Sequence, residues 1–159
     1  MGRRLLVAGC WLLVGVGGGR AQMDAPAKPK AYVMYAAEQE TVAAGKHAVV
    51  ELRFHVVEGY HINSHTPKSE WLIATALKLD PAQGVAAGTL EYPAGKEYSF
   101  SFDPKEKLDV YAGDFTVKVP VVAAAGEHTV VGTLHYQACD NAACYPPRNL
   151  AVTAVFTAK

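Results

Sequence analysis

Hydrophobic and polar residues alternate in several segments of this chain, and a period of two is the pattern of a half-buried β-strand. The clearest case is residues 47–57, where Val50, Leu52, Phe54 and Val56 fall on one face. Because successive strand side chains point to opposite sides, we expect that face to pack in a core. The same alternation predicts further strands over residues 71–79, 115–119, 129–139 and 149–157.

Turn-forming residues separate these segments, for example at Ala44-Gly45-Lys46, Glu58-Gly59 and Ala112-Gly113-Asp114. Pro120 is expected to end the strand before it, and residues 95–109 are predicted to form a long loop of the kind that is often functional. No long amphipathic helix competes with the strands. The pattern therefore predicts an all-β fold, an immunoglobulin-like antiparallel β-sandwich.

The first 21 residues have the features of a signal peptide, with an arginine pair, an apolar run over residues 5–16 and small residues before a cleavage point after Ala21. Cys10 ends a lipoprotein-type box, so a lipid anchor there is the alternative. Residues 22–31 are predicted to be a flexible linker, and residues 32–159 a single domain. The chain is therefore expected to be exported.

Charge and hydropathy exclude several functions for the exported part. The leader holds three arginines and no acidic residue, so the remaining 138 residues carry 12 basic and 15 acidic residues. No basic stripe is present, which argues against nucleic acid binding. No later apolar run approaches 18 residues, so we expect no membrane span in the mature chain.

Two cysteines, Cys139 and Cys144, remain after the leader. In an oxidising compartment such a pair is able to form a disulfide. The last two strands are predicted to form a hairpin with residues 140–148 as its connection, so the bridge would be local. Closing a six-residue loop stabilises a fold by only about 2 kcal/mol. A bridge of this kind is a weak staple, and an attacking thiolate would reach it easily.

Other interpretations of the pair stay open. It can be a small structural disulfide, or half of a zinc site completed by His128 and His135. His61 and His65 are four apart, but the sequence around them indicates a strand and then a loop rather than a helix. We expect no metal and no cofactor, and no hydrolase motif is present.

Several side chains are candidates for the surroundings of the pair. Asp140 would disfavour a thiolate at Cys139, and Arg148 is the nearest permanent cation. Tyr60, Tyr136 and Tyr145 are predicted to line the site as an apolar wall, although each can equally be a core tyrosine.

The run from Tyr136 to Pro147, with its two cysteines and the Tyr-Pro-Pro that follows them, resembles the signature of the amino-terminal periplasmic (alpha) domain of the DsbD thiol:disulfide interchange proteins. Glu58–Asn63 resembles the Gly-Tyr strand of that family, and the stretch from Tyr92 to Pro120 resembles its middle. The similarity covers most of residues 32–157.

The resemblance implies a periplasmic, immunoglobulin-like domain with a reversible Cys139–Cys144 disulfide. It implies thiol-disulfide exchange of the protein-disulfide reductase type, with electrons from a thioredoxin-like protein and a membrane thiol reductase. The electrons would pass to exported disulfide isomerases or cytochrome-maturation proteins. It also implies a cap loop within residues 95–108, with Phe100 or Phe102 as the shield.

The chain departs from the family in three ways. The cysteine spacing is one residue shorter, His61 and Asn63 stand where the family has aromatic residues, and the chain ends after the domain. We therefore expect His61 to line a more polar site, and the electron source to act in trans. By resemblance, Cys144 would be attacked first and Cys139 would resolve. The alternative function is a non-catalytic exported binding module with a structural disulfide.

Overall fold

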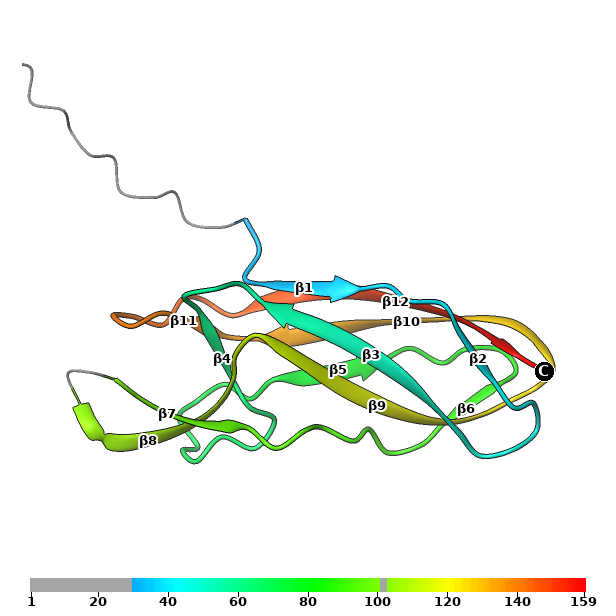
Figure 1. Ribbon diagram of the computed structural model, residues 1–159, viewed down its shortest axis with the longest axis horizontal. Helices are drawn as coiled ribbons and strands as arrows, with labels where there is room; N and C mark the ends of the chain where they lie inside the picture. The colour runs from blue at the N-terminus through cyan, green and yellow to red at the C-terminus, as the bar shows by residue number, and fades with distance from the viewer. Residues whose placement is uncertain (1–29, 101–102) are drawn as a thin grey trace, which may run out of the picture.

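The computed structural model describes residues 30–100 and 103–159 (Figure 1). The predicted signal peptide, most of the predicted linker, and Phe102 lie outside these residues. The described residues form strands and no helix, so none of them belongs to a helix that could cross a membrane. The strands are β1 (Val33–Ala36), β2 (Glu40–Val42), β3 (Ala48–Val56), β4 (His61–Asn63), β5 (Ala76–Leu79), β6 (Val85–Ala87), β7 (Lys96–Phe100), β8 (Asp103–Tyr111), β9 (Asp114–Ala123), β10 (Gly126–Tyr136), β11 (Ala138–Cys139) and β12 (Arg148–Ala158).

Two four-stranded sheets form the sandwich, in the orders β1-β3-β9-β6 and β2-β12-β10-β5. All their pairings are antiparallel except that of β2 with β12. Leu52 and Val119 of the first sheet face Val130 and Phe156 of the second around the same small core cavity. The predicted all-β, immunoglobulin-like sandwich is confirmed.

The alternation in the sequence explains which side chains enter this core. In β3 the four residues predicted to share a face, at positions 50, 52, 54 and 56, are all buried. β10 and β12 pair along their whole length, from Gly126 with Ala158 to Tyr136 with Arg148. The predicted hairpin of the last two strands is therefore present, and its connection carries the cysteines.

A third sheet, β11-β4-β8-β7, lies at one end of the elongated molecule, opposite the C-terminus (Figure 1). Its four strands do not belong to the two sheets of the main sandwich. β11 follows β10 directly but pairs with β4 rather than continuing the β10–β12 ladder. The change of sheet at Gln137 carries Cys139 away from the main core to this end.

The prediction of a long loop over residues 95–109 is wrong, because β7 and β8 pair there as an antiparallel hairpin. The charged run that suggested a loop, residues 104–107, is exposed on β8, while Leu108 and Val110 beyond it are buried. Backbone pairing with β7 and β4 holds the strand, so its exposed half needs no hydrophobic side chains.

Two predicted strand limits are also wrong. Only the second half of residues 71–79 is a strand, since Trp71 is 87% exposed in a turn. β9 does not end before Pro120 but runs on to Ala123. The carbonyl of Pro120 accepts a hydrogen bond from the backbone N–H of Gly88, so its ring nitrogen also faces away from β3 and the β3–β9 ladder loses nothing.

The burial of Cys139 also differs from what strict alternation along one strand would give. The alternation along residues 129–139 placed it on the polar face with Thr133 and His135, but Cys139 is completely buried. The strand breaks after Tyr136, and in the third sheet both faces of the two-residue strand β11 are covered.

Candidate functional site

A tight hairpin places the two cysteines opposite each other. The backbone N–H of Tyr145 donates to the carbonyl of Ala138 at 2.8 Å, and that of Asp140 donates to the carbonyl of Ala143 at 2.9 Å. Cys139 and Cys144 are the antiparallel pair between these two hydrogen-bonded positions. In such a non-hydrogen-bonded pair the side chains approach closely, so the register itself brings the sulfurs together.

The two cysteines form a disulfide with a Cα–Cα distance of 3.9 Å. They differ in exposure, because Cys139 is fully buried whereas Cys144 is exposed on the returning half of the hairpin. A thiolate approaching from solvent therefore meets Cys144 first. Exchange needs access to one sulfur only, and this arrangement provides it.

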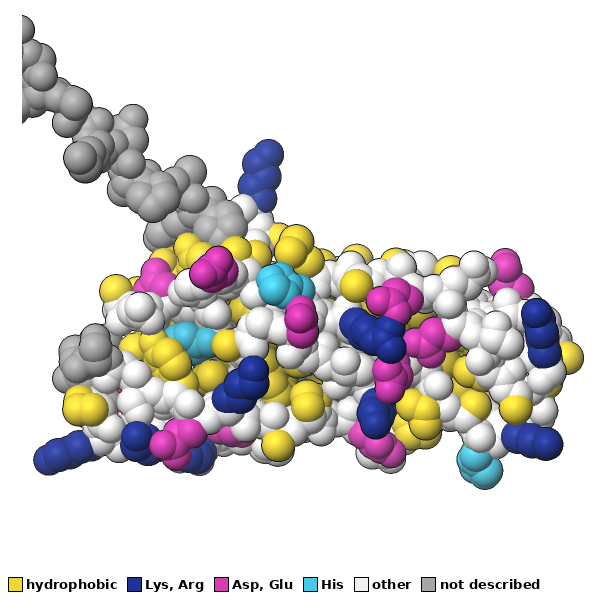
Figure 2. Space-filling model, in the orientation of Figure 1, with side chains coloured by type: hydrophobic (Ala, Val, Ile, Leu, Met, Phe, Trp, Pro, Cys, Tyr) yellow, Lys and Arg dark blue, Asp and Glu magenta, His cyan; other side chains and the backbone are white. Residues whose placement is uncertain are grey.

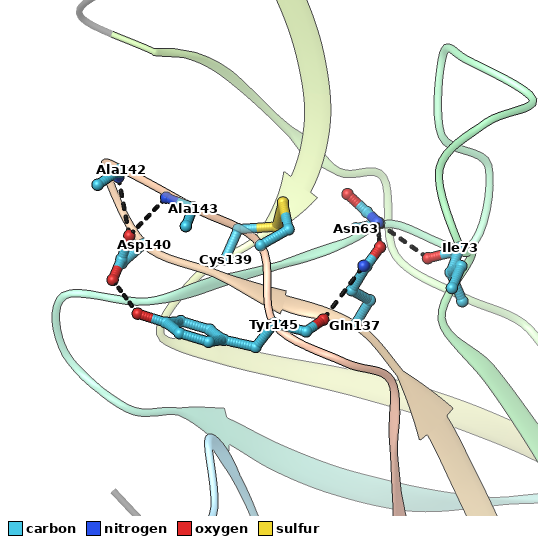
Figure 3. The surroundings of a disulfide bond; sticks show 9 residues. Asn63, Ile73, Gln137, Cys139, Asp140, Ala142, Ala143 and Tyr145 are labelled. Atoms are coloured by element: carbon cyan, nitrogen blue, oxygen red, sulfur yellow. Dashed lines mark hydrogen bonds between the residues drawn. A yellow bond between two sulfur atoms is a disulfide. The ribbon is translucent and has the colours of Figure 1, made fainter. Parts of the chain in front are cut away.

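Asp140 holds the turn that follows Cys139 (Figure 3). Its Oδ1 accepts the backbone N–H groups of Ala142 and Ala143 at 2.8 and 2.9 Å, and its Oδ2 accepts the hydroxyl of Tyr145. This hydrogen bond is the main cause that raises the pKa of Tyr145 to about 12. One carboxylate thus fixes the tip of the hairpin and the residue just after Cys144.

Three tyrosines pack beside the hairpin. Tyr145 stacks on Tyr32 with ring centroids 5.1 Å apart, and Tyr60 lies 4.8 Å from Tyr32 and 6.1 Å from Tyr145. Arg148 lies over the Tyr32 ring at 4.4 Å and donates to the carbonyl of Lys30. The nearest permanent cation is therefore engaged with the start of the domain.

A chain of amide side chains connects the hairpin to the loop after β4 (Figure 3). Gln137 donates to the carbonyl of Tyr145 at 3.1 Å and accepts from Asn63 Nδ2 at 3.5 Å. The same Asn63 nitrogen donates to the carbonyl of Ile73 at 3.0 Å. These contacts fix the strand-switch residue Gln137, for which the sequence carried no separate signal.

His61 is the cross-strand partner of Cys139 in the β4–β11 pair. It is only 3% exposed, and its ring lies 4.0 Å from that of Tyr98 and 5.9 Å from that of Phe100. Burial lowers the pKa of His61, and the negative charge of Asp140 opposes this in part.

β7 covers this side of the hairpin. The hydroxyl of Tyr98 donates to Asn141 Oδ1 at 2.7 Å, at the tip of the turn, and Phe100 packs edge-on against Tyr98 at 5.5 Å. Of the residues predicted to surround the pair, the structure brings Tyr60, His61, Asp140, Tyr145 and Phe100 to this end. Tyr136 is buried in the hydrophobic core. Sequence reasoning missed Tyr98, although it alternates in phase with Phe100, and Tyr32, which is too distant in sequence to signal its place.

The histidines considered as metal ligands have other partners. His128 donates to the carbonyl of Ala124 at 2.7 Å, His135 contacts Asn149 at 2.7 Å, and His65 donates to the carbonyl of Thr75 at 2.9 Å. Within residues 30–100 and 103–159 there is no group of three His, Cys, Asp or Glu side chains arranged to hold a metal ion.

Fold and site together define an all-β domain that presents a hairpin disulfide at one end of a sandwich. The chain belongs to the family of the N-terminal domain of the thiol:disulfide interchange protein DsbD, whose model matches residues 31–155. This confirms the family that the cysteine segment indicated.

The chain is similar to several solved structures. The N-terminal periplasmic domain of ScsB from Proteus mirabilis has a TM-score of 0.51 at 10% identity, over 76% of this chain and 43% of that one. The reduced DsbD N-terminal domain of Neisseria meningitidis has a TM-score of 0.44 at 25% identity, over 69% of this chain and 78% of that one. The complex of the DsbD and PilB N-terminal domains from Neisseria meningitidis has a TM-score of 0.48 at 22% identity, over 80% of this chain and 86% of that one. No curated protein sequence matches the chain.

Proposed function

We propose that this domain is a periplasmic thiol-disulfide relay that exchanges electrons with partner thiol proteins through Cys139 and Cys144. The observation that carries the proposal is the asymmetry of the disulfide, in which Cys144 is exposed and Cys139 is buried. Membership of a thiol:disulfide interchange family supports it. An exposed cysteine in the bridge is open to attack by a partner thiolate, as exchange requires.

The exchange would take place in two displacement steps. A partner thiolate attacks Sγ of Cys144, the Cys139–Cys144 bond breaks, and its electron pair leaves on Cys139. The second thiolate of the partner then attacks the partner's own sulfur in the mixed disulfide and releases Cys144. The partner is oxidised to a disulfide, and the domain gains two electrons and two protons. The reverse sequence passes them on, with Cys139 as the resolving cysteine.

β7 would act as the shield of the pair. Tyr98 is bonded to the tip of the cysteine turn, and Phe100 packs on Tyr98 and His61. These contacts support an aromatic cover over the Cys139 side of the bridge, which would keep small thiols from that sulfur and leave Cys144 as the point of attack. Phe102, the other predicted shield, lies outside the described residues, and its role stays a prediction.

The partners that fit this chemistry are dithiol proteins. We propose a thioredoxin-like protein, itself reduced by a membrane thiol reductase, as the electron donor. Exported disulfide isomerases or cytochrome-maturation proteins would be the acceptors. On the face seen in Figure 2, charged side chains of both signs are interspersed, which suits protein partners better than a polyanion such as nucleic acid.

The reduction potential of the pair tests the relay. The domain is equilibrated in glutathione or dithiothreitol buffers, and the reduced fraction is read by alkylation and mass. We expect a value above about −270 mV, among the exchangeable pairs. A value below about −300 mV would describe a bridge that physiological thiols do not open, and would favour the binding module.

Replacing both cysteines by serine separates the two functions further. A relay with Cys139→Ser and Cys144→Ser stays folded and loses all exchange with a thioredoxin-like donor. If the double variant loses partner binding, and the wild-type domain shows no exchange, a non-catalytic binding module is supported instead.

A further inference from the structure

β4 carries two buried polar atoms that lack a hydrogen-bond partner among the described residues, His61 Nε2 and Asn63 Oδ1. The two residues are two positions apart, so they lie on the same face of the strand. An unpaired polar atom in a buried position is costly, so in a native structure it requires a physical explanation, and a catalytic role is one. Both atoms lie at the end of the molecule that carries the disulfide.

The neighbour of His61 across the sheet is Cys139. Side chains of directly opposed residues on adjacent strands lie on one face, with Cβ atoms about 4.5–5.5 Å apart. The imidazole of His61 therefore lies beside the buried sulfur. In the disulfide this sulfur has no proton to share, but reduction converts it into a thiol that has one.

The surroundings of His61 favour its neutral form. Tyr98 of β7 covers the ring at 4.0 Å, and Asp140 of the cysteine hairpin is the charged group that acts on it. On β8 the ionisable Tyr111 pairs with Ile62, so it belongs to the opposite face of the sheet. Burial lowers the pKa of His61, which leaves the ring free to accept a proton at neutral pH.

We propose that His61 accepts the thiol proton of Cys139 when this cysteine resolves the mixed disulfide. The imidazole becomes imidazolium, the Cys139 thiolate attacks Sγ of Cys144, the intramolecular disulfide forms, and the partner leaves as its thiolate. In the opposite direction the neutral imidazole takes up a proton from solvent as the Cys139 thiolate departs and passes it to that sulfur. The role rests on the proposed relay, and it assigns a general base to a thiol that is otherwise buried next to a carboxylate.

The reaction of the reduced domain with 5,5′-dithiobis(2-nitrobenzoate) measures this step directly. Cys144 attacks the reagent and releases one thionitrobenzoate, and Cys139 then resolves the mixed disulfide and releases the second. The two releases appear as a bimolecular phase and a concentration-independent phase in stopped-flow absorbance. The second phase reports the deprotonation of Cys139.

We expect His61→Phe and His61→Gln to slow the second phase at pH 7 by about a hundredfold, the lower end of the usual range for a general base, and to leave the first unchanged. In the wild-type domain the second phase levels off once the imidazole is neutral. In both variants it rises about tenfold per pH unit, because hydroxide must remove the proton. His65→Gln is the matched control, since His65 stacks on Tyr92 instead, and its second phase stays at the wild-type rate.

Unchanged second-phase rates and pH profiles in both His61 variants would overturn the proposal. If neither variant folds, the imidazole signals of the wild-type domain decide by NMR, because the pKa of His61 must differ between the oxidised and reduced forms. No difference there would also overturn it. The reduction potential tests the relay separately. A low potential would refute the relay, whereas a second phase that depends on His61 would still support His61 as the general base for Cys139.

Discussion

At the scale of single residues, Asp140 has two opposed effects on the pair. Its carboxylate is needed to fix the turn, where it accepts two backbone N–H groups and the Tyr145 hydroxyl. The same negative charge disfavours a thiolate at Cys139, the residue before it. A neighbouring proton acceptor such as His61 would offset this cost without removing the turn.

The bond between Tyr145 and Asp140 makes a prediction about pH. The folded-state pKa of Tyr145 is raised from 10.0 to about 12, so the protonated hydroxyl stabilises the folded domain. This stabilisation is fully present below pH 10 and is lost as the pH rises toward 12. We therefore expect wild-type and Tyr145→Phe to differ in the free energy of unfolding by a constant amount up to about pH 9.5, and by less above pH 10.

Urea denaturation of both proteins between pH 8 and 11 measures this difference. Taking the difference between them cancels the other tyrosines with raised pKa values, such as Tyr92 and Tyr111. A difference in unfolding free energy that stays constant up to pH 11 would show that the bond to Asp140 does not raise the pKa of the Tyr145 hydroxyl.

At the scale of elements, the β7–β8 hairpin and the cysteine hairpin form one unit. β8 pairs with β4, β4 pairs with β11, and the hydroxyl of Tyr98 in β7 donates a hydrogen bond to Asn141 in the cysteine turn. Three segments that are far apart in sequence thereby enclose Cys139. The cover is therefore held twice, by the backbone pairing of β8 with β4 and by the Tyr98 side chain at the tip of the cysteine turn.

Phe100→Ala tests β7 as a shield. Removing the ring opens the side of the hairpin next to His61 and Cys139, so glutathione would reach Sγ of Cys139 as well as that of Cys144. We therefore expect reduction of the disulfide by glutathione to accelerate several-fold. The rate is read as loss of the oxidised mass after acid quenching. Tyr35→Ala, which removes a half-buried ring packed on Phe54 of β3, is the control and leaves the rate unchanged. An equal rate in wild-type and Phe100→Ala would contradict shielding by this residue.

At the scale of the whole molecule, the disulfide is separate from the main source of stability. The core lies between two sheets that the bridge does not connect, whereas the bridge closes a short hairpin in the third sheet. A relay must stay folded in both oxidation states, and this separation allows it.

We accordingly expect reduction to lower the free energy of unfolding by about 2 kcal/mol at most, with the sandwich intact. Leu52→Ala, in the fully buried part of β3, is expected to cost about 2–5 kcal/mol. Urea titrations of the oxidised domain, the reduced domain and the variant give these values. A reduced domain that unfolds without denaturant would show that the bridge is a structural staple.

Local pattern alone determined the main sandwich and the position of the cysteine pair. Alternation in β3, β10 and β12 is set by burial of one face, which any antiparallel sheet imposes on its own residues. The spacing of Cys139 and Cys144 on one hairpin limits them to a local bridge. Both features depend on residues close together in sequence, so they are readable there.

Tertiary structure alone decided the third sheet and the environment of the pair. The exposed charged residues of β8 and the proline in β9 do not favour a strand by their local sequence. They form strands because pairing with partners distant in sequence outweighs local preference. The burial of Cys139 depends on a change of sheet at Gln137, and its neighbours His61 and Tyr98 come from other parts of the chain. Sequence determined which residues carry the chemistry, whereas long-range pairing decided which sulfur is exposed and what lies beside the other.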